Sequence, residues 1–168
     1  MNAIFFGFKR CGKTTLGKAV AKRLDRPFID TDELLGAPPS TLYHKMGEEK
    51  FRILEANVIR ALPPLHHAII SVGGGAMINP NNVHILSRLG TLIYLKVDEI
   101  VLAERNCRKP LPAFLDPYNL EASFAAIYAK RSALYESIPA IHFDLSRKEC
   151  DAAVFELCTM ITKNTHGT

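Results

Sequence analysis

Short apolar runs alternate along the chain with longer stretches in which apolar residues recur every three or four positions. The apolar runs have the character of buried β-strands, and we expect strands at residues 3–6, 27–29 leading into Asp30, 68–72, 91–97 and 141–145. The periodic stretches predict helices at residues 13–24, 48–62, 82–89, 99–107, 120–135 and 151–161. Strands separated by helices in this way predict a parallel sheet with helices on both faces.

The same pattern predicts which side of a helix faces the core. In the helix at residues 13–24, the positions Leu16, Val20 and Leu24 share one face. In the helix at residues 48–62, the buried side is expected to comprise Phe51, Leu54, Val58 and Leu62. The preceding segment 36–40 reads Gly-Ala-Pro-Pro-Ser and is expected to be a turn.

Composition fits a single globular domain over residues 1–168. Hydrophobic residues make up 48% and charged residues 23% of the chain, which excludes a disordered, collagen-like or disulfide-scaffold protein. No apolar stretch approaches the ~20 residues of a membrane-spanning helix. The short apolar N-terminal run is followed, not preceded, by Lys9 and Arg10, unlike an export signal. We therefore expect a cytoplasmic protein without a membrane partner.

The net charge of +4 is mild and is not gathered in a dense basic stripe. Nucleic-acid-binding proteins often show such a stripe, so we expect no nucleic-acid partner. A mild positive excess suits an anionic small substrate, although a random bias of surface residues gives the same net charge. No additional apolar surface element is visible, and we expect a monomer.

The most specific motif lies at residues 7–14, where Gly-Phe-Lys-Arg-Cys-Gly-Lys-Thr matches the phosphate-binding pattern G-x-x-x-x-G-K-[ST]. A predicted strand precedes it and an amphipathic helix follows it, as this P-loop requires. Its glycines let backbone N–H groups surround phosphate oxygens, and the helix N-terminus adds positive partial charge. Lys13 is expected at the β- and γ-phosphates of a nucleotide, with the Thr14 hydroxyl as a ligand of Mg²⁺.

Two acidic residues, Asp30 and Asp32, follow the second predicted strand. Because they are two positions apart on an extended segment, their carboxylates are expected to point the same way. Beside a P-loop, one can hold the water shell of the metal while the other faces an acceptor hydroxyl. By themselves, they also fit the N-cap of a helix.

Three consecutive glycines, Gly73, Gly74 and Gly75, follow the third predicted strand. Glycine allows close approach of a ligand to the backbone, which favours a binding loop over a flexible turn. In parallel sheets ligands bind at the carboxyl ends of the strands, which is where the motifs described so far are located.

Other basic residues allow two interpretations each. Arg52 and Glu55 are about one helical turn apart, which fits a functional pair or a surface ion pair of little energy. Arg131 has the same ambiguity. Segment 105–117 is basic and rich in proline, and fits a lid over a transferring phosphate or a solvated connection. The six histidines show no metal-binding spacing, so no transition-metal site is expected.

Taken together and in this order, the motifs resemble the shikimate kinase family. The similarity runs from Met1 to about Ile161 and rests on the P-loop, Asp30-Thr31-Asp32, residues 47–55, residues 71–76, and Lys130-Arg131 ahead of Leu134-Tyr135. It implies a three-layer α/β sandwich of the P-loop NTPase type, in the nucleoside-monophosphate-kinase branch, with a five-stranded parallel sheet of order 2-3-1-4-5. It also implies Mg²⁺-assisted transfer of the ATP γ-phosphate to the 3-hydroxyl of shikimate, a step toward chorismate and the aromatic amino acids.

The resemblance assigns roles to individual residues. ATP would be held by the P-loop, with two arginines at the adenine: Gly7, Arg10, Cys11, Gly12, Lys13, Thr14, Thr15, Arg105 and Arg147. Thr14 and Asp30 would organise Mg²⁺, and Asp32 would be the base for the attacking hydroxyl. Shikimate would lie against Asp32, Arg52, Gly73, Gly74, Gly75 and Arg131. Arg52 and Arg131 would grip the carboxylate of shikimate with their planar forks of donors. The Gly74 backbone would contact a ring hydroxyl. The substrate segment would span about residues 32–62.

The chain departs from the family pattern in the P-loop and in the lid. The family usually has glycine where this chain has Arg10, so we expect strain there if φ is positive. The usual lid sequence Arg-Pro-Leu-Leu is replaced by Lys109-Pro110-Leu111-Pro112, and either Lys109 or Arg108 would supply the cation of the transition state. Lysine keeps the charge but lacks the planar fork, so weaker transition-state stabilisation is expected. The lid and the segment between Asp32 and Arg52 are also shorter than usual.

Two other functions stay open at this point. Another small-acid kinase of the same branch, such as a gluconate kinase, would share the P-loop but would not need the three glycines together with Arg52 and Arg131. A catalytically silent nucleotide-binding module would fit the altered P-loop and lid, but has no need for a carboxylate such as Asp32 facing a hydroxyl.

Overall fold

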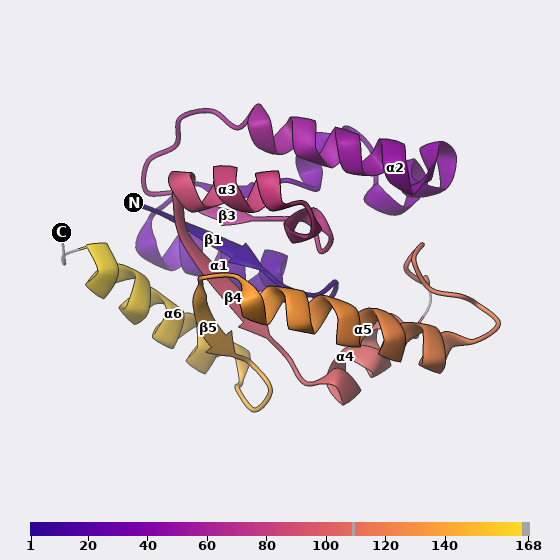
Figure 1. Ribbon diagram of the computed structural model, residues 1–168. Coiled ribbons are helices and arrows are strands. Elements are labelled where there is room, and N and C mark those ends of the chain that lie inside the picture. The colour runs from indigo at the N-terminus through magenta and orange to yellow at the C-terminus, as the bar shows by residue number, and fades with distance from the viewer. Residues whose placement is uncertain (109, 166–168) are drawn as a thin grey trace.

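The strands of the molecule form a single parallel sheet in the computed structural model, which describes residues 1–108 and 110–165 (Figure 1). Their order is β2-β3-β1-β4-β5, as the family resemblance implied. Their bounds are Asn2–Phe6 for β1, Phe28–Asp30 for β2, Ile69–Ser71 for β3, Gly90–Lys96 for β4 and Ile141–Asp144 for β5. The five predicted strands are thereby confirmed, with ends that differ by one or two residues.

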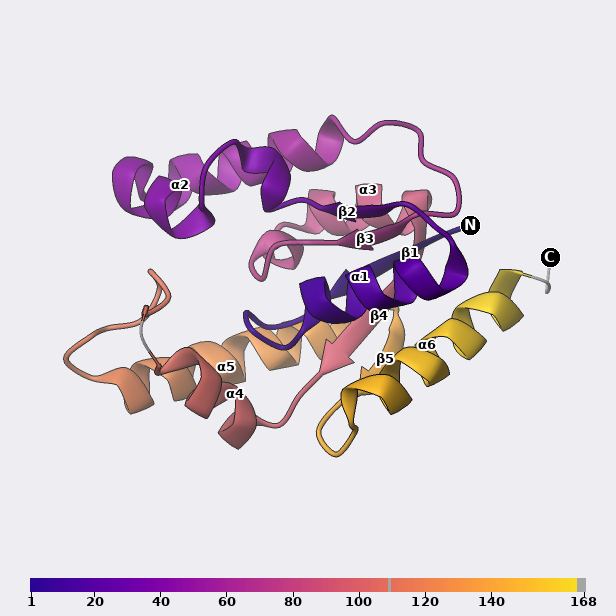
Figure 2. The ribbon, with the colours of Figure 1, turned by 180° about the vertical axis from the view of Figure 1, so that it is seen from behind.

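Helices cover both faces of this sheet and complete three layers. Their bounds are Lys13–Leu24 for α1, Pro39–Arg60 for α2, Pro80–Leu89 for α3, Glu99–Asn106 for α4, Leu120–Ser137 for α5 and Cys150–Thr165 for α6. Helices α3 and α5 lie in front of the sheet in Figure 1, whereas α1 and α6 lie in front of it in the reverse view of Figure 2. Helix α2 packs against α3, and α4 packs against α5. The predicted fold class is confirmed.

The core lies on both sides of the central strand. All five residues of β1 are buried, because β3 and β4 pair with it on either edge and helices cover its two faces. Phe5 and Phe6 are fully buried there, together with Ile69 and Ile70 of β3. Within residues 1–108 and 110–165, no helix is long and apolar enough to cross a membrane.

The sequence pattern was wrong about the start of α2. The expected turn at 36–40 ends at Pro38, and the helix begins at Pro39, because proline fits the first helical position, where no N–H is needed. A short 3-10 turn, Glu33–Leu35, precedes it. Gly47, at φ 81° and ψ 167°, interrupts the helix with a kink. The expected helix at 48–62 is therefore only the second half of a longer element.

The buried side of α2 also differs from the expected one. It comprises Phe51, Glu55, Ala56 and Ile59. Leu54, Val58 and Leu62 are only half-buried. Hydrophobic periodicity places charged residues outside, but here a carboxylate faces inward because it has a charged partner, described below.

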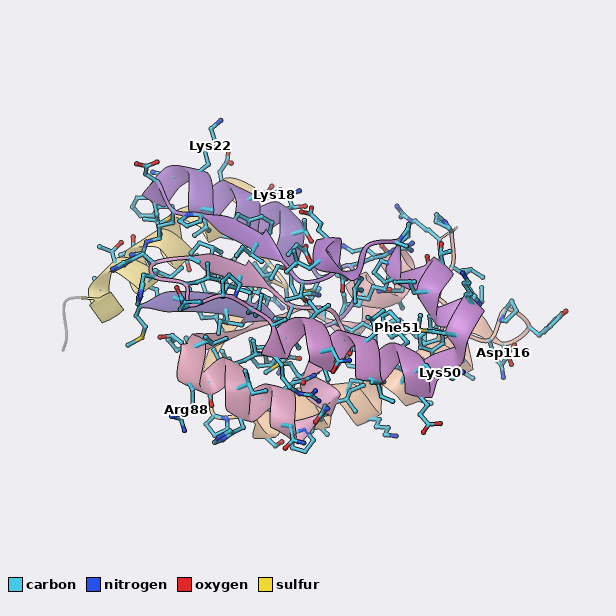
Figure 3. All side chains as sticks on the ribbon, turned by 90° about the horizontal axis from the view of Figure 1, so that it is seen from above. Lys18, Lys22, Lys50, Phe51, Arg88 and Asp116 are labelled. Atoms are coloured by element: carbon cyan, nitrogen blue, oxygen red, sulfur yellow. The ribbon has the colours of Figure 1, made fainter. Side chains whose placement is uncertain are left out.

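The architecture brings the carboxyl ends of the strands to one edge of the sheet. Helix α2 and the connection 107–119 between α4 and α5 extend past that edge on opposite sides (Figures 1 and 2). Figure 3 shows Phe51 and Lys50 on α2 and Asp116 on the connection at this end of the molecule, and Arg88 on α3 nearer the other end. Most of the site residues predicted from the sequence are placed around this edge.

Candidate functional site

A cavity of about 380 Å³ opens at the carboxyl end of the strands. Eleven of the residues expected from the sequence are among those that line it: Arg10, Gly12, Lys13, Thr14, Thr15, Asp30, Asp32, Arg52, Gly74, Gly75 and Arg131. The P-loop, the end of β2, helix α2, the glycine loop and α5 thus contribute to one site. Residues that are far apart in the sequence meet here because the parallel strands end at the same edge.

Other predicted residues are not part of the lining. Gly7, Cys11 and Gly73 touch residues that line the cavity without lining it themselves. Arg105, Arg108 and Arg147 are exposed and lie outside the lining. Lys109 lies outside the described residues. The structure therefore brings the predicted phosphate and substrate residues together in one cavity, whereas Arg105, Arg108 and Arg147 stay outside it, although Arg105 and Arg108 are hydrogen-bonded to Arg10, which lines it.

The P-loop wraps around the ammonium group of Lys13. Lys13 Nζ donates to the carbonyl oxygens of Gly7 at 3.0 Å and Phe8 at 2.8 Å, so the side chain folds back across its own loop. Gly12 has φ 107°, and no side chain of the described residues caps the start of α1. The backbone N–H groups there are free to bind an anion, and the helix dipole favours negative charge at this point. Together these features form a phosphate cradle.

Thr14 and Asp30 form the polar edge of that cradle. Thr14 Oγ1 donates to Asp30 Oδ2 at 2.6 Å, and Asp30 is buried. Hydroxyl and carboxylate oxygens are hard ligands of the kind Mg²⁺ takes when most of its other ligands are water and substrate phosphates. Within the part of the chain that the structure describes, no group of three or more His, Cys, Asp or Glu residues could hold a metal ion. This donor set therefore fits Mg²⁺ bound together with a nucleotide.

Asp32 lies beside the cradle but in a backbone conformation that differs from the expected one. Its φ of −68° and ψ of −32° are helical rather than extended, because the chain turns directly into the 3-10 turn. Its N–H donates to Asp30 Oδ1 at 3.0 Å, which keeps the two carboxylates adjacent. Its side chain makes no capping hydrogen bond, so the alternative of a simple N-cap finds no support.

The surroundings of Asp32 raise the pKa of its carboxyl above the ordinary value. Burial raises the pKa of the Asp32 carboxyl, and the negative charge of Asp30 raises it further. Positive charges on Lys13, Lys9 and Arg52 act against that rise. A carboxylate with a raised pKa is a better proton acceptor than an ordinary aspartate, which suits a general base.

Arg52 and Glu55 form an ion pair that is not on the surface. Arg52 Nη1 lies 2.9 Å from Glu55 Oε2, and Glu55 is only 4% exposed. Burial raises the pKa of Glu55, and the charge of Arg52 opposes that rise. The surface-pair alternative is therefore wrong. Arg52 Nε is buried without a hydrogen-bond partner among the described residues, so the guanidinium keeps a donor for a ligand.

The glycine loop makes room for these charged groups. A Cβ atom at Gly73 would lie 2.6 Å from Asp32 Oδ1 and 2.7 Å from Glu55 Oε1. A Cβ atom at Gly75 would overlap the guanidinium of Arg52. Glycine is thus required because carboxylates and a guanidinium occupy the space of a side chain. The carbonyl of Gly74 accepts a hydrogen bond from Tyr135, a buried residue of α5.

Arg131 is held differently from Arg52. It is 7% exposed, and its guanidinium lies 4.6 Å from the ring centre of Phe114 and 5.5 Å from that of Phe8. Burial lowers its pKa. It makes no salt bridge within residues 1–108 and 110–165. The aromatic faces position this cation without neutralising it.

Sequence reasoning missed several residues that line the cavity. Lys9 is half-buried there, and burial lowers its pKa while the charge of Asp32 raises it. It occupies a variable position of the P-loop pattern, so the motif gave no signal for it. Glu55, Tyr43 and Phe114 also line the cavity. The sequence marked Glu55 only as a neighbour of Arg52, whereas Tyr43 lies between the turn expected at 36–40 and the helix expected at 48–62, where no element was predicted.

Comparison with known proteins agrees with this geometry. The family model described as shikimate kinase matches residues 9–162. A shikimate kinase of Dechloromonas aromatica is 36% identical over 150 residues, which cover 85% of this chain and 80% of that protein. A shikimate kinase of Burkholderia thailandensis is 33% identical over 161 residues, which cover 92% of this chain and 86% of that protein.

Solved structures give the same result. Shikimate kinase from Acinetobacter baumannii, solved in complex with shikimate, has a TM-score of 0.87 at 25% identity, covering 97% of this chain and 93% of that one. A gluconokinase from Sinorhizobium meliloti has a TM-score of 0.59 at 17% identity, with 98% and 97% of the two chains covered. That second likeness concerns the fold alone.

Proposed function

The chain belongs to the shikimate kinase family, and on that premise we propose that it transfers the γ-phosphate of ATP to the 3-hydroxyl of shikimate, giving shikimate 3-phosphate and ADP. One observation carries the proposal. A single cavity is lined by a phosphate-binding lysine, a half-buried carboxylate and two arginines: Lys13, Asp32, Arg52 and Arg131. A nucleoside triphosphate matches the lysine. An acid that carries a nearby hydroxyl matches the carboxylate and the two arginines.

At the phosphate end of the cavity, the chain neutralises the negative charge of the nucleotide phosphates. The backbone N–H groups of Gly12, Lys13, Thr14 and Thr15 surround the β-phosphate, and the Lys13 ammonium moves from the loop carbonyls toward the β- and γ-phosphates. Thr14 and Asp30 would hold Mg²⁺, which supplies neutralisation of phosphate charge when it is bound. Phosphoryl transfer asks mainly for positioning and charge stabilisation, so no covalent nucleophile is required of this chain.

Asp32 accepts the proton of the attacking hydroxyl. The hydroxyl oxygen forms a bond to the γ-phosphorus, the bond from that phosphorus to the bridging oxygen of the β-phosphate breaks, and ADP leaves. The proton moves to the Asp32 carboxylate, whose burial raises its pKa and makes it a stronger base. Lys9 and Lys13, whose charges both act on Asp32, keep enough of it ionised for this role.

Arg52 and Arg131 bind the carboxylate of shikimate. Arg131 carries an unneutralised charge against aromatic faces, and Arg52 offers a buried unpaired donor. Both can present parallel N–H groups to the two oxygens of a carboxylate. The backbone of Gly74 contacts a ring hydroxyl, and Gly73 and Gly75 leave room for the side chains of Asp32, Glu55 and Arg52.

The remaining roles are carried over from the family. Arg105 and Arg147 would border the adenine, and Arg108 or Lys109 would supply the lid cation over the γ-phosphate. We propose that lid segment 105–117 and substrate segment 32–62 move within one domain. We also propose a monomer that acts in the cytoplasm on ATP and shikimate, without nucleic-acid or membrane partners.

A coupled assay of ADP release with Mg-ATP tests the function directly. Shikimate, gluconate and a nucleoside monophosphate are offered in parallel, each at the same concentration. We expect release that depends on shikimate alone. Turnover with gluconate or the nucleotide instead would overturn the roles of Arg52 and Arg131. ATP binding without turnover on any acceptor would support a silent nucleotide-binding module.

A further inference from the structure

Arg10, at the tip of the P-loop, reaches out of the loop to a different part of the chain. Its Nη1 donates to the carbonyl oxygens of Arg105 at 2.6 Å and Arg108 at 3.0 Å, and its Nη2 donates to that of Pro110 at 2.5 Å. One guanidinium thus collects backbone oxygens from the end of α4 and the start of the connection that follows.

Residues at the end of α4 also donate hydrogen bonds back to the P-loop. Arg105 Nη1 donates to the carbonyl of Arg10 at 3.2 Å. Asn106, which is fully buried, donates to the carbonyl of Lys9 at 2.9 Å and to that of Leu102 at 2.9 Å. Lys9 and Arg10 are therefore tied to the last turn of α4 by side chains from both partners. We call these contacts of Lys9 and Arg10 with Arg105, Asn106, Arg108 and Pro110 the P-loop clasp.

The clasp comes with backbone strain. Arg10 has φ 64°, a left-handed conformation that glycine adopts freely and that costs energy for other residues. Such strain persists where surrounding contacts enforce it, and it points to a function for the residue. A glycine here would relax the backbone but would have no side chain to reach α4.

We propose that Arg10 is a positioning residue that fixes Arg105, Arg108 and Pro110 against the phosphate cradle before ATP binds. The guanidinium serves oxygens on three residues from two separate nitrogens, whereas lysine holds all its donors on one nitrogen, so we expect lysine to replace it poorly. Ordering the site in advance lowers the entropy cost of binding, so the clasp raises the affinity for ATP. The kinetic part of this inference rests on the proposed function, whereas the structural part does not.

Two substitutions distinguish the effect of the clasp hydrogen bonds from the effect of the positive charge alone. Arg10→Gly removes the side chain and relieves the strained backbone, while Arg10→Lys keeps the charge and loses the fork. Asp25→Gly is the matched control, because Asp25 also has a positive φ, of 52°, at the C-terminal end of α1. Melting temperatures of all variants confirm that each is folded.

Limited trypsin digestion, followed by mass spectrometry, measures without any substrate how strongly the clasp protects this segment from cleavage. For Arg10→Gly we expect cleavage after Arg105 and Arg108 to accelerate roughly tenfold or more, because three hydrogen bonds that held this segment are lost. We expect KM for ATP to rise about fivefold or more, with a smaller change in KM for shikimate. Arg10→Lys should resemble Arg10→Gly, and Asp25→Gly should resemble the parent protein.

Each contrary result overturns the proposal. Unchanged cleavage in Arg10→Gly would mean that no clasp holds this segment. Faster cleavage with an unchanged KM for ATP would make the contact purely structural. Full rescue by Arg10→Lys would assign the effect to charge, and an ATP effect without a cleavage effect would place Arg10 on the nucleotide. If the parent protein shows no turnover with shikimate, the proposed function fails, but the digestion still decides whether the clasp exists.

Discussion

The phosphate half and the acceptor half of the cavity are built in opposite ways. The phosphate half comes from a single stretch, residues 7–15, together with Asp30. The acceptor half combines Asp32 with α2, the glycine loop and α5. One half is therefore local in the sequence, and the other exists only when the sheet and helices have assembled.

The two halves also hold their cations differently. Lys13 rests on neutral carbonyls, which leave its charge available for phosphate. Arg52 is paired with buried Glu55, so part of its charge is neutralised before any substrate arrives. Arg131 stands between aromatic rings and keeps its full charge. The comparison indicates that Lys13 governs the rate of transfer, whereas Arg131 governs capture of the acid more than Arg52 does.

The largest effect should come from the phosphate half. We expect Lys13→Met to lower kcat about a thousandfold, because the cation that stabilises the transferring phosphoryl group is lost. KM for shikimate should change little, since the acceptor half is intact. Steady-state kinetics with both substrates varied measures this, with Lys22→Met on the exposed side of α1 as the control. A KM for shikimate that rises as much as kcat falls would show that the two halves are not separable.

A smaller effect, confined to the acceptor half, is expected for Arg131→Lys. Lysine keeps the charge but loses the bidentate fork and the flat contact with Phe114, so KM for shikimate should rise roughly thirtyfold. KM for ATP should stay near the parent value. Arg88→Lys, on α3 and nearer the other end of the molecule, is the matched control. If Arg52→Lys raises KM for shikimate more than Arg131→Lys does, the assignment of the dominant carboxylate contact is wrong.

The same contrast explains what the sequence could predict. The strands are continuous apolar runs and the P-loop is a fixed spacing, so both are visible in neighbouring residues. The order β2-β3-β1-β4-β5 came from the family resemblance, because no local pattern specifies which strands pair. Lys13 and Gly7, whose carbonyl the ammonium binds, are six positions apart within this one motif.

The acceptor half was less accessible to the same reasoning. Pro38 and Pro39 suggested a turn, although Pro39 begins α2, and the helix was expected only from residue 48, although Gly47 merely kinks a longer helix. Glu55 was expected outside the apolar face, because periodicity cannot see that Arg52 and the glycine loop meet it in the interior. Such contacts depend on residues that are close only after folding, so no local pattern contains them.

Lys9 gives the smallest and most discriminating test, because it belongs to the phosphate loop but acts on the acceptor half. Its charge lowers the pKa of Asp32, which burial raises. With Asp32 as the base, kcat/KM falls as the pH drops and Asp32 takes up a proton. Lys9→Met removes the opposing charge, so the pKa of Asp32 rises and the acidic limb of the profile moves to higher pH. On that limb we expect kcat/KM to fall roughly threefold, with little change on the plateau.

The pH dependence of kcat/KM for Lys9→Met and for the exposed Lys50→Met on α2 measures this effect. The two substitutions remove the same charge from the same region, but only Lys9 lines the cavity. If the acidic limb moves equally in both variants, its cause is the change in net charge and not the position of Lys9 near Asp32. If the acidic limb of the profile stays in place for Lys9→Met, the phosphate loop does not act on the acceptor half through Lys9. The opposing positive charge on Asp32 would then come from Lys13 and Arg52 alone.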